Sequence, residues 1–272
     1  MKEPTALTDH FALDIVASAL DGFVPPSEAF DPAGDWRHTY RVCTLTRNCD
    51  VAGEVVIARK ALDRGGCTLT VEYHKRLAGG YRQEVTVEID CLGDTFSTPL
   101  RWRYDAEMFT PSGDAVAHTR IAHTAVVGDG FLVINDSTDT RRIAMPEACT
   151  LHWALFDAVQ RLPREPFDPA AFTLLDHLDE VKPGHVLSYR GAIDVLLGAR
   201  KVQRHEYEEL EKGRIRKTRW EEEGGEMARL HGYQDLGQGI VPRVYWVDKS
   251  GRLLFLVAGL EAYLWTPTEA AS

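Results

Sequence analysis

EVTVEIDC, residues 84–91, alternates polar and apolar side chains without a break. Successive side chains of a β-strand point to opposite faces, so a strand with this pattern has one apolar face and one solvated face. Such alternation is typical of an antiparallel sheet that is covered on one side only. The apolar positions are Val85, Val87, Ile89 and Cys91.

The same period of two residues extends along the chain in both directions from this strand. It covers about residues 37–135 and resumes from about residue 184 to residue 265, and links such as VGDG at residues 127–130 supply the glycine that tight turns need. WEEEGGEMARL (residues 220–230) and YWVDKSGRLLF (residues 245–255) each place an acidic turn with glycine between an aromatic and an apolar segment. Both are predicted to be hairpins, and the chain is predicted to be mainly antiparallel β.

Two segments replace this period with helical spacing. Apolar residues over positions 8–21 predict an amphipathic N-terminal helix, and a proline-rich linker follows it. A second apolar stripe predicts a helix over residues 150–162, which Pro163 ends. We therefore divide the chain into residues 1–36 (N-terminal helix and linker), residues 37–266 (β domain with the inserted helix) and residues 267–272 (tail).

The composition is that of an ordinary water-soluble globular protein, with 272 residues, 44% hydrophobic and 26% charged. The 31 Lys and Arg residues against 41 Asp and Glu residues give a formal net charge of −10. A net negative field disfavours binding to nucleic acids and to anionic membranes. No apolar run approaches the ~20 residues that a membrane-spanning helix needs, so no membrane span is expected.

The five cysteines form no C-x-x-C pair, so a metal-thiolate site is not expected. Cys43 and Cys49 are either free or joined across a turn, depending on the redox compartment. The start, MKEPTALTDHFALD, lacks the basic end and apolar stretch of a secretion signal. We expect an extracytoplasmic location (periplasm or cell surface) if a signal has been removed, and a cytoplasmic one otherwise.

Three stretches carry a resemblance to a known family: YRVCTLTRNCDVAGEVVIARK (residues 40–60), YRGAIDVLLGARKVQRHEYE (residues 189–208) and VYWVDKSGRLLFLVAGLEAYLW (residues 244–265). In these stretches the chain resembles the bacterial lipoprotein-carrier superfamily (the LolA/LolB-like fold) and related exported families. The resemblance implies a single strongly curved antiparallel sheet, an open barrel, with a central helix in its concave face. It also implies an apolar cavity between helix and sheet, and it brings no catalytic motif.

The chain lacks a G-x-G-x-x-G after a strand, a P-loop, a G-x-S-x-G elbow and an H-E-x-x-H helix. Nucleotide-dependent, serine-esterase and zincin activities therefore have no local support, and neither a cofactor nor a metal is expected. The segment LLDHLDE, residues 174–180, is either an acid/base cluster or a solvated turn. If the protein is an enzyme, the candidate catalytic residues are His123, His152, Asp157 and His205.

Aromatic side chains are the candidates for ligand binding. On the predicted central helix, His152 would provide a polar group, and Trp153 and Phe156 would provide apolar contact. Tryptophans at alternating strand positions either add to such a wall or pack in the core. The predicted ligand-binding residues are Trp102, His152, Trp153, Phe156, Trp220 and Trp246.

The leading hypothesis is a binding or carrier protein for a small apolar or amphiphilic molecule, held in the cavity of the curved sheet. The alternative is a hydrolase or lyase whose histidines and carboxylates converge in the same cavity. A third hypothesis is a structural module of an envelope assembly, which would have an exposed apolar patch. The sequence does not determine the ligand or the oligomeric state.

Overall fold

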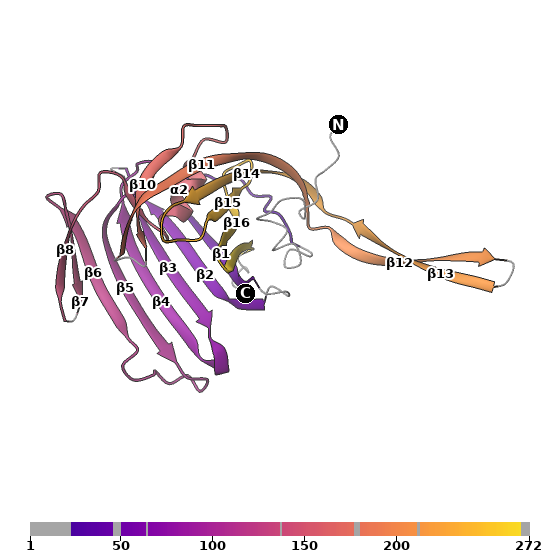
Figure 1. Cartoon of the computed structure of the whole chain (residues 1–272), viewed down its shortest axis with the longest axis horizontal. Coiled ribbons are helices and arrows are strands. Elements are labelled where there is room, and N and C mark those ends of the chain that lie inside the picture. Colours follow the sequence, from indigo (N-terminus) through magenta and orange to yellow (C-terminus); the bar gives the residue numbers. More distant parts are fainter. Residues whose placement is uncertain are drawn as a thin grey trace.

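The body of the protein is one sheet of 15 strands whose two edges do not meet (Figure 1). This computed structural model describes residues 23–45, 50–63, 65–136, 138–176, 180–210 and 213–267. The strands of the sheet are β1 (Trp36–Thr44), β2 (Asp50–Ala61), β3 (Cys67–Arg76), β4 (Arg82–Cys91), β5 (Pro99–Phe109), β6 (Ile121–Gly128), β7 (Phe131–Asp136), β8 (Thr140–Ala144), β9 (Cys149–Leu151), β10 (Ala170–Asp176), β11 (Glu180–Leu197), β14 (Glu226–Leu236), β15 (Arg243–Val247), β16 (Leu253–Ala258) and β17 (Glu261–Thr266). The other elements described are the paired strands β12 (Arg200–Leu210) and β13 (Gly213–Glu223), the α-helix α2 (Leu155–Arg161) and the 3-10 turn η3 (Ala78–Gly80).

Strands that follow one another in the chain lie side by side through most of the sheet. The spatial order is β8-β7-β6-β5-β4-β3-β2-β1-β17-β16-β15-β14-β11-β10-β9. β1 pairs with β17, with Val42 opposite Tyr263, and this pairing joins the N-terminal and C-terminal parts of the sheet. Of these neighbours, β9 and β10 run parallel and the others run antiparallel. The prediction of a mainly antiparallel β protein is confirmed.

The alternation that predicted this fold is present in β4. Val85, Val87 and Ile89 are buried, while Thr86 and Glu88 between them are exposed. Their buried side belongs to the main hydrophobic core. One face of β4 is thus covered and the other is solvated, as the sequence predicts.

The VGDG link forms the expected tight turn between β6 and β7. Asp129 and Gly130 both have positive φ, 52° and 74°, and positive φ at both central residues is the backbone conformation of a type I′ hairpin turn. A side chain added at Gly130 would meet open space, so glycine stands there for its backbone conformation.

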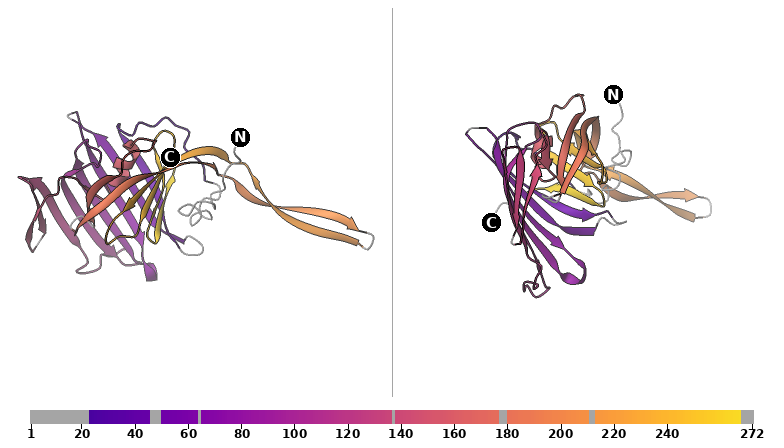
Figure 2. Two further views of the ribbon diagram at one scale, coloured as in Figure 1. Left: turned by 45° about the horizontal axis from the view of Figure 1, so that its top comes forward. Right: turned by 60° about the vertical axis from the view of Figure 1, so that its left-hand side comes forward.

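The sheet curves so that strands from both of its halves face α2 (Figures 1 and 2). The ring of Phe156 lies 5.5 Å from Tyr40 of β1 and 5.6 Å from Tyr263 of β17, measured between centroids. Trp153, just before the helix, lies 5.9 Å from Tyr73 of β3. The segment around α2 therefore fills part of the concave face, as expected for an open barrel.

The predicted helix over residues 150–162 is too long. Cys149–Leu151 is the strand β9, which lies beside β10, and α2 begins only at Leu155. Leu162, before Pro163, is extended, because a residue that precedes proline is pushed out of the helical region. Residues 155–160 of α2 are all buried, the polar side chains of Asp157 and Gln160 included, so the buried surface extends beyond the predicted apolar stripe.

The same sheet carries a second, smaller core on its other face, over β15, β16 and β17. Phe23 packs there, with its ring 5.0 Å from Phe255 and 6.3 Å from Trp265. Tyr245 belongs to the main core and Trp246 to the second one, because adjacent strand residues point to opposite faces. This part of the sheet is therefore covered on both faces.

The hairpin predicted at WEEEGGEMARL is wrong. β13 runs on into β14 across Gly224 and Gly225, both with positive φ, and β12 likewise continues β11. The four strands form one long ribbon, and its outer part, β12 with β13, extends away from the body (Figures 1 and 2). The second predicted hairpin is confirmed, since β15 and β16 pair across the turn at Asp248. The predicted N-terminal helix over residues 8–21 and all but Pro267 of the tail lie outside the described residues.

Candidate functional site

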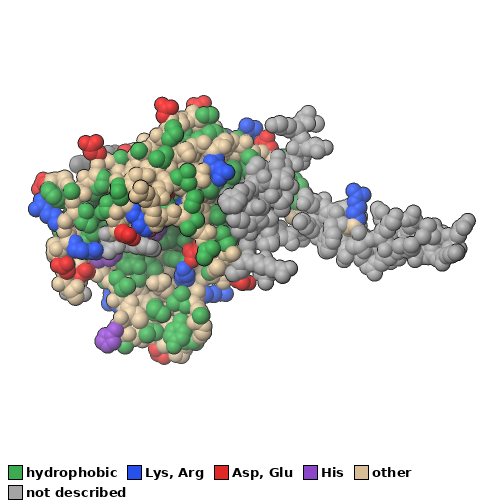
Figure 3. All heavy atoms as spheres, viewed as in Figure 1, with side chains coloured by type: hydrophobic (Ala, Val, Ile, Leu, Met, Phe, Trp, Pro, Cys, Tyr) green, Lys and Arg blue, Asp and Glu red, His purple; other side chains and the backbone are tan. Residues whose placement is uncertain are grey.

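A cavity of about 610 Å³ lies on the concave side of the sheet, beside α2. Its walls come from β3, β4 and β5 on one side and from β10, β11 and β15–β17 on the other. In a space-filling view, hydrophobic side chains gather in a hollow of the body with charged side chains around it (Figure 3). The lining residues are Tyr73, Lys75, Gln83, Val85, Tyr104, His152, Trp153, Phe156, Asp176, Lys182, Gly239, Ile240, Val241, Arg243, Tyr245, Leu256, Ala258, Gly259, Glu261 and Tyr263.

Aromatic rings form the apolar part of the cavity wall. Trp153 lies 5.7 Å from Phe156 and 6.5 Å from Tyr263 between ring centroids, the second pair edge to face. All three side chains are buried, as is Leu256 nearby. Ring centroids at these distances are in the range of favourable aromatic pairs, so the wall is well packed.

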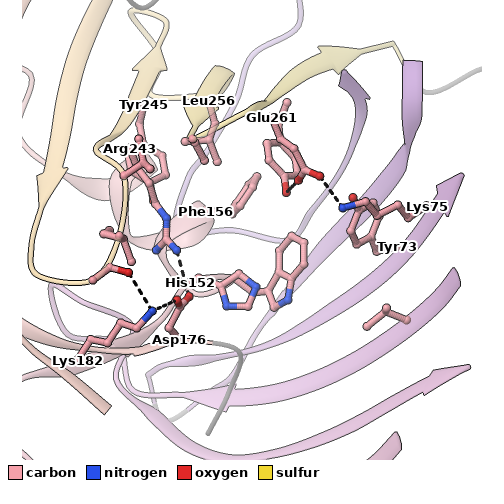
Figure 4. Close-up of a pocket in the computed structure, with 18 of the residues that line it drawn as sticks. Tyr73, Lys75, His152, Phe156, Asp176, Lys182, Arg243, Tyr245, Leu256 and Glu261 are labelled. Atoms are coloured by element: carbon pink, nitrogen blue, oxygen red, sulfur yellow. Dashed lines mark hydrogen bonds and ion pairs between the residues drawn. The ribbon is translucent and has the colours of Figure 1, made fainter. Parts of the chain in front are cut away.

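A group of three charged side chains stands on one side of the cavity (Figure 4). Asp176 accepts a hydrogen bond from Lys182 Nζ at 2.7 Å and another from Arg243 Nη2 at 3.1 Å. The hydrogen bond to Asp176 raises the pKa of Lys182, which keeps this amine charged. Glu180 also lies 3.4 Å from Lys182 Nζ, so the two cations of this group each have a carboxylate beside them.

Behind this group the charges continue into the protein interior. Arg243 Nη1 lies 3.8 Å from a carboxylate oxygen of Asp235, and Asp235 is 2.8 Å from Nδ1 of His185. Neither Asp235 nor His185 is exposed to solvent. Burial raises the pKa of Asp235 against the opposing hydrogen bond from His185. The ion pairs hold Arg243 in place and fix its direction toward the cavity.

A second charged pair stands across the cavity from the first group (Figure 4). Lys75 Nζ is 2.6 Å from Glu261 Oε1, and Tyr263 donates its hydroxyl to the other oxygen of Glu261 at 3.1 Å. The hydroxyl of Tyr73 is buried in the same wall and has no hydrogen-bond partner among the described residues. Burial, with the charge of Glu261 as a smaller cause, raises the pKa of Tyr73, so this hydroxyl is a neutral donor.

Three of the six predicted ligand-binding residues line this cavity: His152, Trp153 and Phe156. His152 precedes α2 and stands between the two charged groups, with its ring 4.6 Å from that of Trp153. The structure therefore brings this part of the prediction together in one place.

The three other tryptophans lie elsewhere. Trp102 is buried in the main core and Trp246 in the second core on the opposite face of the sheet. Trp220 belongs to β13, in the two-stranded ribbon apart from the large sheet. Neither Trp102 nor Trp246 is among the residues that line the cavity.

The four candidate catalytic residues do not converge. His152 alone lines the cavity; His123 stacks on Tyr104 at 4.9 Å, and His205 belongs to β12 of the separate ribbon. Asp157 is fully buried and pairs with Arg59 Nε at 2.8 Å and with Arg161 at 3.1 Å. Asp157 thus ties α2 to β2.

Several residues of the cavity carry no local sequence signal. Lys75, Lys182, Arg243 and Glu261 come from four different strands, and each reads as an ordinary solvated strand residue in the sequence. Asp176 does belong to the flagged acidic segment LLDHLDE, whose residues 177–179 lie outside the described part of the chain.

No three His, Cys, Asp or Glu side chains among the described residues come together as metal ligands would. Within the same ranges, no helix has the length and apolar character needed to cross a membrane. Cys49 lies outside these ranges, so a bridge between it and Cys43 stays a prediction.

No family model matches the sequence, and no curated protein matches it. Among solved structures, the chain is similar to a β-barrel-like protein of a domain of unknown function, DUF1849, from Brucella abortus. The two share 11% sequence identity with a TM-score of 0.46, over 86% of this chain and 95% of that chain.

Proposed function

We propose that this protein binds one small amphiphilic molecule in the concave cavity. The observation that carries this proposal is an aromatic wall flanked on two sides by charged groups, in a cavity of about 610 Å³. Ligand pockets of roughly 300–1,000 Å³ bury most of a small molecule, so this volume suits a single ligand. The binding role is that expected for the lipoprotein-carrier resemblance, and an extracytoplasmic location is part of the same proposal.

The aromatic wall would hold the apolar part of the ligand. Trp153, Phe156 and Tyr263 are each less than one-tenth exposed and leave a rigid apolar surface toward the cavity. Burying apolar area there contributes roughly 25 cal/mol per Å² before the cost of immobilising the ligand.

The charged groups would hold the polar end. Lys75, Lys182 and Arg243 provide three cations at the wall against the two anions Asp176 and Glu261. Asp235, 3.8 Å from Arg243, and Glu180, 3.4 Å from Lys182, add two carboxylates beside these cations. The wall therefore presents both signs of charge, which favours a ligand with a charged or strongly polar head group. The free hydroxyl of Tyr73 offers that head group a hydrogen-bond donor.

No observation on the described residues favours the hydrolase or lyase alternative. A general acid or base must lie within hydrogen-bond reach of a second catalytic group or of the substrate. The candidate catalytic residues lie in separate places, so catalysis forms no part of the proposal.

Native mass spectrometry of protein purified without detergent, before and after organic extraction, tests the proposal directly. We expect an excess mass of one ligand per chain that extraction removes. The extracted protein should then bind the fluorescent probe cis-parinaric acid, an anionic amphiphile, at one site. A clean mass with no saturable uptake of the probe would overturn the proposal.

A matched pair of substitutions places the bound probe. Ala258→Trp fills the cavity from β16 and should abolish probe binding, whereas Ala122→Trp, at an exposed position of β6 away from the cavity, should not change it. Equal binding by both variants would mean that the probe binds elsewhere.

Tyr73→Phe is a second test, because it should weaken probe binding without destabilising the fold. Removing a buried hydroxyl that has no partner should leave the free energy of unfolding unchanged or raise it slightly. The same change should weaken probe binding by about 1 kcal/mol, the usual worth of one hydrogen bond, if Tyr73 donates to the ligand. Unchanged affinity would remove Tyr73 from the proposed site.

A further inference from the structure

Two cysteines face each other across the strand pair β3–β4. Cys67 is the first residue of β3, Cys91 is the last residue of β4, and the register places them directly opposite. Residues opposite one another in an antiparallel pair have Cα atoms roughly 4.5–5.5 Å apart, within the range of roughly 4.4–6.8 Å that a disulfide spans. The register therefore places the two cysteines within the backbone separation that a disulfide spans.

The two side chains are in contact, and both are free thiols. Both point to the same buried face of the sheet, with 1% and 2% of each residue exposed. The hydrogen bond between them lowers the pKa of Cys67, and the same bond, together with burial, raises the pKa of Cys91. Cys67 is thus the better thiolate of the pair, and Cys91 is the proton donor.

The pair lies at an end of its strands, next to two turns. Gly66 precedes Cys67 and lies close to the backbone at the end of β4. A Cβ added to Gly66 would lie 2.3 Å from the carbonyl oxygen of Cys91. Gly93, on the other side, would collide with Gly66 in the same way, at 2.9 Å. The ends of strands open more readily than their middles, so an oxidant can reach these thiols by local opening.

Charged groups of both signs lie close to the pair. Cys67 Sγ lies 3.9 Å from a carboxylate oxygen of Asp157, and Arg59 and Arg161 pair with that carboxylate. The arginines stabilise a thiolate at Cys67, while the charge of Asp157 opposes it. By contrast, burial raises the pKa of Cys149 to about 12, with no second thiol to support it.

We propose that Cys67 and Cys91 are a dithiol that is oxidised reversibly to a cross-strand disulfide by thiol–disulfide exchange. The Cys67 thiolate attacks a small-molecule disulfide such as oxidised glutathione, forming a mixed disulfide and releasing one thiolate. Cys91, after losing its proton, attacks the Cys67 sulfur and releases the second thiolate. The protein loses two electrons and two protons, and the oxidant becomes two thiols.

The test uses the full reduced chain, folded, in non-denaturing buffer with excess oxidised glutathione. After acid quench and alkylation, we expect the intact mass to show two alkyl groups fewer than the reduced control, with no glutathione adduct. Peptide mapping should show the bond between Cys67 and Cys91. The oxidised chain should melt higher than the reduced chain, by on the order of 5 °C, because the bond closes a loop in the unfolded state.

Single-cysteine variants separate this pair from the other cysteines. Cys149→Ser should keep the whole effect, since Cys149 is free and is not opposite another cysteine in the sheet. Cys67→Ser should abolish both the loss of two alkyl groups and the rise in melting temperature. It should also leave no fast thiol–disulfide exchange at Cys91. A disulfide mapped to other cysteines, or oxidation that occurs only in denaturant, would overturn the proposal. Circular dichroism of each variant verifies that it is folded, and Cys91→Ser provides the same test if Cys67→Ser does not fold.

Discussion

Asp157→Asn removes the charge of a carboxylate that is fully buried between two arginines. Its oxygens lie 2.8 Å from Arg59 Nε and 3.1 Å from Arg161 Nη2, and Ser97 donates its hydroxyl to it at 2.6 Å. The asparagine side chain would still fill the space but would leave Arg59, whose side chain is 5% exposed, without its counter-charge.

The expected loss follows from the burial of this cluster. Removing one partner of a buried ion pair costs about 3–5 kcal/mol, because the remaining charge stays out of water without compensation. The asparagine keeps one acceptor oxygen, and Arg59 keeps its hydrogen bonds to the carbonyls of Ala33 and Gly34, so the lower end applies. We expect a loss of about 3 kcal/mol, equivalent to roughly 6–12 °C in Tm for a chain of this size.

Urea unfolding followed by far-UV circular dichroism at pH 7 measures this loss. Asp194→Asn is the matched control, because Asp194 is 57% exposed and its contact with Arg229 is 3.4 Å long; we expect a loss below about 1 kcal/mol there. Probe binding per folded molecule should not change in Asp157→Asn, since Asp157 does not line the cavity. A loss of unfolding free energy no larger than that of Asp194→Asn would refute a structural role for the buried ion pair. Lost probe binding with unchanged stability would instead indicate that Asp157 belongs to the functional site.

Three further predictions concern pH and packing. Burial, with the Arg252 charge as a lesser cause, lowers the pKa of His38 to about 3. Between about pH 6.5 and pH 3 only the unfolded state therefore binds a proton at this histidine. The free energy of unfolding falls as the pH falls through that window. Between pH 7 and pH 5, urea titrations should show His38→Phe losing about 2 kcal/mol less than wild type; equal losses would contradict the pKa shift. Gly237→Ala should cost about 1–3 kcal/mol, because its Cβ would lie 2.4 Å from the buried ring of His185, whereas Gly128→Ala has open space and should be nearly neutral in the same urea assay. Trp246→Ala should lower Tm by several degrees and leave cis-parinaric acid affinity unchanged, and a lost affinity would show that the two faces of the sheet are coupled.

Strand positions were the part of the fold that short-range pattern could predict. Alternation over residues 84–91 correctly gave the buried and exposed positions of β4, and the glycine of VGDG gave a turn, because both depend on neighbouring residues alone. The same rule failed at Gly224 and Gly225, where the glycines allow the ribbon to leave the main sheet and do not reverse the chain. A hairpin turn and a ribbon that continues out of the sheet can both use glycines with positive φ. The glycines alone therefore do not distinguish the two structures.

The helix and the aromatic residues show what the local sequence pattern does not predict. Residues 150–162 have helical spacing, yet β9 takes the first of them because β10 offers backbone hydrogen bonds there. Trp246 and Tyr245 are neighbours with similar chemistry, and only the way the sheet curves decides that Tyr245 faces the cavity. A period of two separates the faces of a strand but does not say which one is concave.

The sequence by itself therefore determined the class of the fold and the strand pattern, since both depend on local periodicity. Only the tertiary structure decided which charges meet. Lys75 and Glu261 are 186 positions apart, and Arg243 and Asp176 are 67 apart, yet both pairs form at the cavity wall. Their proximity depends on the order and curvature of the strands, which arise from the packing of the whole sheet and not from any short stretch of residues.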